Sequence, residues 1–374
     1  MGDYKGVATP LFHFIIIIKI FGGAGDMVTL ALPALATNEE QTRYVVSLLE
    51  KHVRGFGRGI QLLLFSNVLD NAVLEEEVVR VSTTVVPGSF RKIFHAPIAP
   101  HHYDSRLNLS CEESVEVYVH LARLVARCGG EAMIIHTNCT YEPDQWESVT
   151  RAHIYDRMLQ KVYGHLKAII AQSPVPILLE NLPTPLKGDV TSDSATLVFD
   201  PFLGTVEQIR EFYDGAVCGL QFCFDTSHYG ILRRQVNNLA MKYGSGITSH
   251  DVNKEGLKVF CEDVVMQPGL EGLYAQLRVL MGKKMTCVQL ADYKGEWRAA
   301  HGNDKGSIFE EGSIVGGGDF GEELLSFTVA YARDYPTGII SVDVGVEDFL
   351  KRDEQIVSLQ RVVEALKKAG VKEE

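Results

Sequence analysis

The chain has 374 residues, of which 22% are charged and 46% hydrophobic, a composition typical of a globular protein with a large core. Its net charge of -12 and pI of about 5.5 speak against a broad basic surface for nucleic acids. They leave room for a local basic patch, or for a metal that supplies positive charge inside a site. The length suits one (β/α) barrel with insertions or two smaller domains.

The apolar N-terminal run Leu11–Phe21 carries His13 and Lys19 and is far shorter than the ~20 residues that a membrane span needs. No small-residue cleavage site follows it cleanly, so we do not expect a secretory signal. The seven cysteines are odd in number and form no CxxC pair, which favours free thiols in a reducing compartment over a disulfide framework. We therefore expect a cytoplasmic protein without a membrane contact.

Eight short apolar runs along the chain have the character of strands. The first, Phe14–Phe21, is continuous and β-branched, as in a strand that is buried on both faces. The other strands are predicted at Ile60–Phe65, Lys92–Phe94, Ala132–Ile135, Pro176–Leu179, Leu220–Phe224, Met285–Val288 and Gly338–Val342.

Helical segments alternate with these strands. A capping signal at Thr37-Asn38 predicts a helix over Glu39–Val53, and Ser110 is expected to cap another that ends at Arg127. Further helices are predicted at Asn71–Val81, Trp146–Ala171, Thr205–Tyr213, Glu322–Asp334 and Arg352–Ala369. Eight βα units predict an α/β fold, a (β/α)8 TIM barrel that spans residues 1–374 as one domain. The segment 231–284 is interpreted as a mostly helical insertion before strand seven.

Metal-ligand residue types end most of the predicted strands. In a TIM barrel the C-terminal strand ends converge on one mouth, where active sites are found. Imidazole and carboxylate groups are what an ion such as zinc or manganese prefers, so we predict a divalent-metal site there; the alternative is a polar mouth filled with water. The candidate ligands are His95, His136, Glu180, Asp225, Gln289 and Asp343, together with His228, which lies three residues after Asp225.

Several of these positions carry a resemblance to a known group of proteins. The sequence resembles the xylose-isomerase-like TIM-barrel superfamily, and is most similar in its motifs to endonuclease IV (AP endonuclease family 2), a zinc enzyme that cuts DNA at abasic sites. The resemblance runs from about Phe14 to the last helix. The matching motifs are His95-Ala96-Pro97 with Asn108-Leu109-Ser110, Ile135-His136-Thr137, Leu179-Glu180-Asn181 and Phe224-Asp225-Thr226-Ser227-His228.

The resemblance implies three ion positions. The first would use His95, His136 and Glu180, all of which match the family. The second would share Glu180 and add Asp225, with Gln289 and Asp343 standing where the family has a histidine and a glutamate.

The third ion position would use His228 and an Asp-x-His motif before the glycine-rich loop Val315-Gly316-Gly317-Gly318. Counting back from that loop finds Glu310 and Gly312 instead. His301 or Asp304 is then the candidate substitute for the missing ligand.

Two enzymatic functions follow from these implications. The first is metal-dependent phosphodiester hydrolysis at abasic sites in DNA, with Glu180 shared between ions and Lys294 meeting phosphate. The second is isomerisation or epimerisation of a sugar or sugar phosphate with one manganese or magnesium ion, where Glu180 and Asp343 would form the acid/base pair. A third interpretation is a barrel that has lost its chemistry and serves as a binding protein. The oligomeric state is left open.

Overall fold

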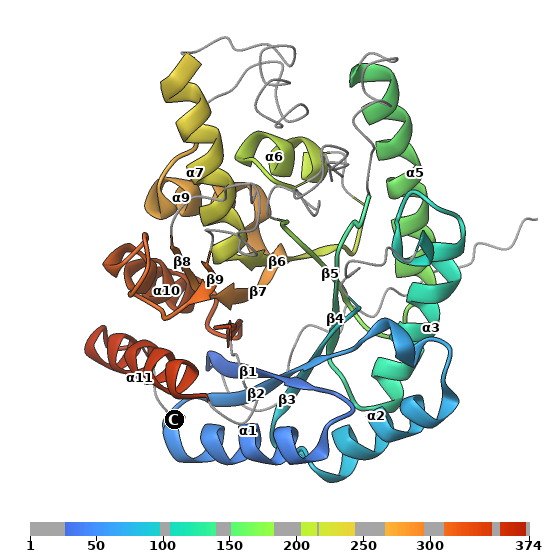
Figure 1. The fold of residues 1–374 in the computed structure, drawn as a ribbon, viewed down its shortest axis with the longest axis vertical. Helices are drawn as coiled ribbons and strands as arrows, with labels where there is room; N and C mark the ends of the chain where they lie inside the picture. Colours follow the sequence, from blue (N-terminus) through green and yellow to red (C-terminus); the bar gives the residue numbers. More distant parts are fainter. Residues whose placement is uncertain are drawn as a thin grey trace, which may run out of the picture.

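A computed structural model describes residues 27–97, 105–139, 151–182, 203–214, 217–243, 266–294, 310–345 and 352–371. Eight parallel strands close into a barrel in the order β1-β10-β7-β6-β5-β4-β3-β2, with helices around it (Figure 1). The predicted TIM barrel is therefore confirmed. The strands are β1 (Thr29–Leu35), β2 (Gly57–Leu63), β3 (Arg91–His95), β4 (Ala132–Ile135), β5 (Ile177–Glu180), β6 (Gln221–Asp225), β7 (Met285–Leu290) and β10 (Ile339–Val342). A separate antiparallel pair, β8 (Asp292–Lys294) and β9 (Glu310–Ser313), follows β7.

The helices lie close to their predicted positions. The Asn38 side chain accepts a hydrogen bond from the Gln41 amide, which confirms the predicted cap. The expected cap at Ser110 is wrong, because α3 starts three residues later and Ser110 instead donates to the Asn108 side chain. The helices are α1 (Glu39–His52), α2 (Ala72–Thr84), α3 (Glu113–Arg127), α5 (Arg151–Gln172), α6 (Val206–Asp214), α7 (Thr226–Tyr243), α9 (Leu270–Met281), α10 (Glu322–Asp334) and α11 (Asp353–Lys368). None of them, within the part of the chain that the structure describes, is long and apolar enough to cross a membrane.

The first barrel strand is Thr29–Leu35, and the barrel closes without Phe14–Phe21. The interpretation of Phe14–Phe21 as the first barrel strand is therefore wrong, and that run lies outside the described residues. β1 contains Pro33, which usually argues against an inner strand. Here β10 pairs with β1 only as far as Ala31, and the Pro33 carbonyl accepts from Arg352 rather than from a strand. Pro33 therefore deprives no neighbouring strand of a donor on that side.

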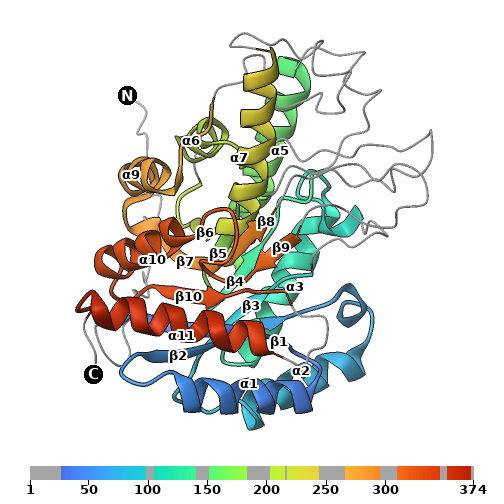
Figure 2. The same ribbon diagram turned by 60° about the vertical axis from the view of Figure 1, so that its left-hand side comes forward.

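The segment interpreted as an insertion is helical at both of its described ends. α7 begins directly where β6 ends, and α9 lies between α6 and α10 (Figure 2). On one side Arg210 of α6 donates to Gln276 of α9, and on the other Tyr274 of α9 donates to Asp334 of α10. α9 therefore takes part in the outer helical layer. The middle of 231–284 lies outside the described residues, so its role as an insertion stays a prediction.

The barrel interior has an apolar floor and a polar mouth. The floor is an apolar plug of small and branched residues, made by Ala31, Ile93, Ala132, Ile134, Leu178, Cys223, Cys287 and Ile339. Toward the C-terminal strand ends the buried residues become polar, namely Gln61, His95, His136, Glu180, Asp225 and Gln289. Because successive residues of a strand face opposite sides, Cys223 and Asp225 of β6 belong to adjacent layers on the same inner face. The plug thus forms the floor of a polar barrel mouth.

Candidate metal centre

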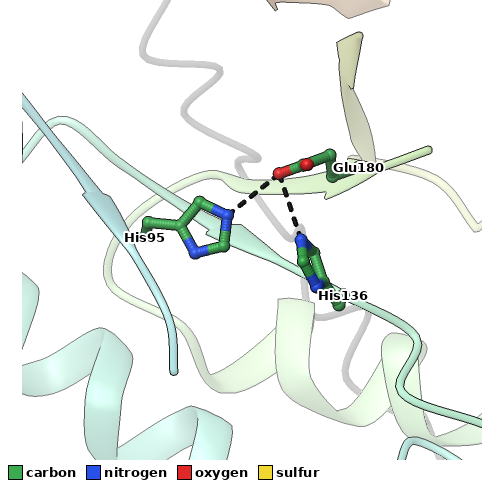
Figure 3. A group of neighbouring side chains, drawn as sticks. All are labelled: His95, His136 and Glu180. Carbon is green, nitrogen blue, oxygen red and sulfur yellow. Dashed lines mark hydrogen bonds and ion pairs between the residues drawn. The ribbon is translucent and has the colours of Figure 1, made fainter. Parts of the chain in front are cut away.

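Glu180 is the centre of the polar layer. It ends β5 and is only 1% exposed. Its Oε2 atom lies 3.0 Å from Nε2 of His95, at the end of β3, and 3.3 Å from Nε2 of His136, just after β4. Figure 3 shows the two imidazoles converging on this one carboxylate oxygen. The three strand-end residues predicted as the first ligand set are thus brought together.

The tautomer of His95 leaves an electron pair facing Glu180. Its Nδ1 lies 2.7 Å from the backbone carbonyl of Ala96. A carbonyl can only accept, so Nδ1 carries the proton and Nε2 of the neutral ring is a bare acceptor. That acceptor then faces a carboxylate oxygen, which is also an acceptor. The contact is favourable only when a cation lies between the two atoms or a proton sits on Nε2.

His136 presents a second ring nitrogen to the same carboxylate oxygen. Its ring is 5% exposed, and within the part of the chain that the structure describes its Nε2 makes no hydrogen bond. The ligand atoms of His95, His136 and Glu180 all lie within 4.8 Å of one another. The anchoring of His95 by a backbone carbonyl is what metal-binding histidines commonly show. The three residues fit a divalent ion with a two-histidine, one-carboxylate ligand set.

Burial and mutual charge set the pKa values of the cluster. Burial alone would lower the pKa of His95, but the hydrogen bond to Glu180 and the Glu180 charge outweigh it and raise the pKa. Burial lowers the pKa of His136, with some opposition from Glu180. Burial would raise the pKa of Glu180, yet the three surrounding imidazoles hold it well below its usual value. Glu180 is therefore a carboxylate, and a cation that binds here competes with the proton on His95.

The other oxygen of Glu180 faces His228 and Asp225. Nδ1 of His228 lies 3.1 Å from Glu180 Oε1 and 2.9 Å from the Asn181 carbonyl, so this nitrogen carries a proton. Asp225 accepts through Oδ1 from the Ser227 hydroxyl and the His228 amide. The Asn181 side chain bonds both backbone groups of Asp225 and ties β5 to β6. Glu180, Asp225 and His228 form a second group with metal-ligand spacing.

Two buried glutamines complete the layer, and one of them was not predicted. In the amide orientation that satisfies its neighbours, the Gln289 nitrogen donates to both Glu180 oxygens at 2.9 Å, and its oxygen accepts from Gln61 Nε2 at 3.0 Å. Gln61 Nε2 also lies 3.2 Å from Oδ2 of Asp343, just beyond β10. A chain of hydrogen bonds therefore joins Glu180 to Asp343. The sequence signal for Gln61 was a single amide inside the apolar run of β2.

Asp292 has a structural role that the motif comparison did not reveal. It is fully buried, and its carboxylate accepts from the backbone amides of Gly318, Phe320 and Gly321 at 2.9–3.1 Å, and from its own neighbour Tyr293. It therefore fixes the glycine-rich loop before α10. Gly318 must be glycine, because a Cβ there would lie 2.3 Å from the Tyr293 carbonyl.

The remaining predicted site residues are placed only in part. Lys294 is the exposed last residue of β8. Its catalytic role stays a prediction. His301 and Asp304 lie outside the described residues. Glu310 and Gly312 belong to β9, the strand that pairs with β8.

Comparisons with known proteins place the fold. No family model matches the chain, and no curated protein matches its sequence. A D-tagatose 3-epimerase-like protein superposes with a TM-score of 0.52 at 12% identity, covering 91% of this chain and 98% of that one. A xylose isomerase domain protein from Planctomyces limnophilus gives 0.50 at 10% identity (92% and 97%). Endonuclease IV from Thermus thermophilus gives 0.48 at 14% identity (91% and 99%). The chain therefore shares the TIM-barrel fold of the D-tagatose 3-epimerase-like protein and of the xylose isomerase domain protein.

Proposed function

We propose that this protein is a divalent-metal-dependent hydrolase whose ion is held by His95, His136 and Glu180. The observation that carries the proposal is the convergence of two imidazole nitrogens on one oxygen of a buried carboxylate. Two histidines and one glutamate, with a further position open, are the ligand set of zinc hydrolases. A cation held there supplies Lewis acidity toward water and toward a substrate oxygen.

The residues of this chain would prepare the site before substrate arrives. The Ala96 carbonyl fixes the ring of His95, while His228 and Gln289 fix the Glu180 carboxylate. Their burial keeps bulk water away, so the charges in the cluster act at a lower dielectric than they would at the surface. Such fixed ligands need no rearrangement to receive the ion, and zinc is the proposed metal, with manganese or magnesium as alternatives.

The proposed substrate is DNA that carries an abasic site, and the proposed reaction is hydrolysis of a phosphodiester bond. The proposal rests on the resemblance in the His95, His136, Glu180 and Asp225 motifs. Lys294 is the proposed phosphate contact, since an exposed ammonium at the end of β8 does not carry the desolvation cost of a buried one. With a net charge of -12, contact with DNA would be confined to a small region.

A duplex with one abasic site tests this proposal. We expect incision by protein loaded with zinc, manganese or cobalt, and none by His136→Ala under the same conditions. His120→Ala is the matched control, because His120 is an exposed histidine of α3 that bonds Glu75. Absence of incision with all three metals would refute DNA cleavage. Equal incision by wild type and His136→Ala would refute the ligand assignment.

Isomerisation or epimerisation of a sugar or sugar phosphate is the second candidate. It is favoured by the chain Glu180–Gln289–Gln61–Asp343, which joins a buried and a half-buried carboxylate in one network. Two acids that share a network can move a proton between adjacent carbons. Incubation of the manganese-loaded protein with ketoses and ketose phosphates in D2O tests it. Deuterium at a carbon next to the carbonyl would support it, and its absence from all of them would count against it.

We further propose a cytoplasmic location without a membrane contact. Six cysteines are free among the described residues, and they include Cys223 and Cys287, which pair in register across β6 and β7 without a disulfide. Free thiols are typical of a reducing compartment. Mass spectrometry of the alkylated native protein, with all thiols found reduced, is the measurement that checks this.

A further inference from the structure

We infer that Phe65, together with Leu35 and Leu63, binds the apolar C–H surface of a sugar in the substrate. The inference rests on the proposed metal-dependent function and deepens it, because it assigns a second contact to the same substrate. In both candidate reactions the reacting atoms belong to a sugar or are bonded to a sugar oxygen. A sugar is therefore the part of the substrate that lies closest to the ion.

The end of β2 directs Leu63 and Phe65 into the barrel. Side chains along a strand alternate between its two faces, and Leu62 and Leu64 belong to the outer core, where each is at most 3% exposed. The strand geometry continues beyond Leu63, because the Leu64 amide donates to the His95 carbonyl and the Phe65 backbone is extended. Leu63 and Phe65 therefore face the interior, at the C-terminal end of the strand.

Leu35 extends this apolar surface onto β1. It is the partner of Leu63 in the parallel register of the two strands, so the two side chains face the same side of the sheet. Leu35 and Leu63 are half-buried, and Phe65 is 46% exposed. Exposure thus increases toward the rim of the mouth. These three residues are called the apolar wall.

The apolar wall lies across the mouth from the candidate metal centre. In the closed order of the eight strands, β5 is four places from β1, and β6 is four places from β2 (Figure 1). Glu180 ends β5 and Asp225 ends β6. The interior of an eight-stranded barrel has room for one small ligand at most, so a single sugar unit can reach both sides. A substrate in the mouth would meet the ion on one side and Phe65 on the other.

The exposure of Phe65 distinguishes it from other apolar residues at the surface. Among the described residues, the exposed valines Val73, Val279 and Val357 lie on outer helices, whereas Phe65 lies at the mouth. Apolar and aromatic side chains with a few polar groups are the usual lining of a small-molecule site. A phenyl ring offers no hydrogen bond, so it contacts the carbon skeleton of a sugar and leaves the oxygens to the polar side of the mouth. The part of the ring left in water contributes to binding when a ligand covers it.

Calorimetric titration with probes that have or lack a sugar tests the inference. The zinc-loaded full-length chain is titrated with 2-deoxyribose 5-phosphate, with D-fructose 6-phosphate and with inorganic phosphate. We expect Phe65→Ala to weaken binding of at least one sugar phosphate by roughly 3- to 10-fold, because a ligand can bury only the exposed half of the ring. Binding of inorganic phosphate should stay unchanged. Phe65→Tyr, which keeps the ring, and Val73→Ala, at a position of α2 that is 77% exposed, should bind all three probes as wild type does.

The two sugar phosphates distinguish the source of the sugar. A larger effect of Phe65→Ala on 2-deoxyribose 5-phosphate supports a wall for the abasic residue of DNA, and a larger effect on D-fructose 6-phosphate supports one for a free ketose.

Three outcomes would overturn the inference. They are equal binding of both sugar phosphates by wild type and Phe65→Ala, an equal loss for inorganic phosphate, and no binding of either sugar phosphate by wild type. Retained zinc, measured on the same samples, separates this from a failure of the proposed function. A chain that keeps zinc but shows any of these outcomes contradicts the apolar wall alone, whereas a chain without zinc contradicts the metal-dependent function. Circular dichroism checks the folding of Phe65→Ala.

Discussion

The two layers inside the barrel differ in what they contribute. The plug of Leu178, Cys223 and their neighbours buries apolar side chains and supports stability. The mouth above it buries Glu180, three imidazoles and two amides, which are costly to bury unless each polar atom has a partner. Among the described residues, Nε2 of His136 has no hydrogen-bond partner, so this requirement is not fully met there. This difference indicates that the mouth is organised for binding, at the expense of stability.

Removing the shared carboxylate should have the largest effect. Glu180→Gln keeps the size of the side chain but removes the charge on which His95 and His136 converge. We expect zinc affinity to fall by more than the ~10–100-fold typical of changes outside the ligand set. Retained metal after desalting is the measurement, with exposed Glu322→Gln of α10 as the control. Unchanged metal content in Glu180→Gln would show that the mouth is not the metal site.

A cavity in the plug should separate stability from binding. Leu178 is 1% exposed, so Leu178→Ala should lower the free energy of unfolding by ~2–5 kcal/mol. Urea unfolding measures this, and Val279→Ala, at a position that is 84% exposed, should change it by less than about 0.5 kcal/mol. The metal count of Leu178→Ala should match that of wild type. Loss of metal without loss of stability would mean that the layers do not have separate roles.

Neutralising Asp292 should have a smaller effect. Asp292→Asn weakens the charge-assisted bonds from the amides of the glycine-rich loop, each of which contributes ~1.5–3 kcal/mol. Because asparagine retains one acceptor oxygen, we expect the loss of about one such bond in urea unfolding. Exposed Asp319→Asn in the same loop is the control. If Asp292→Asn leaves stability unchanged but abolishes activity, Asp292 belongs to the chemistry.

The smallest predicted effect is that of Lys294. An exposed charged contact contributes ~0.2–1 kcal/mol, so Lys294→Met should raise KM for an abasic-site duplex by roughly 1.4- to 5-fold. The value of kcat should hold, because the cluster at Glu180 is untouched. Steady-state kinetics at two salt concentrations measures both parameters. A large fall in kcat would instead place Lys294 at the reacting phosphate.

Strand ends were predictable from the sequence, and so was the first ligand set. A buried strand that opens onto a polar mouth leaves a short apolar run in the sequence that stops on a polar residue. The runs before His95, His136 and Glu180 have this pattern. Gln61 was missed because it lies inside an apolar run, where only the closed barrel shows which face is inward. The network from Gln61 to Glu180 depends on contacts between strands far apart in the chain, which no local pattern carries.

The first barrel strand was predicted at the wrong segment. Phe14–Phe21 has the stronger β-branched pattern, whereas the true strand Thr29–Leu35 contains Pro33. Propensity favoured the wrong segment because the pairing partner decides whether a proline is tolerated. β10 ends its pairing before Pro33, and Arg352 takes the carbonyl. That compensation comes from a residue 319 positions away in the chain.

Anomalous diffraction from crystals of the zinc-loaded protein tests the central claim most directly. We expect a strong peak within ~2.0–2.2 Å of Nε2 of His95, Nε2 of His136 and Oε2 of Glu180. Absence of a peak between these three atoms, in crystals that show zinc elsewhere on the chain, would contradict the account.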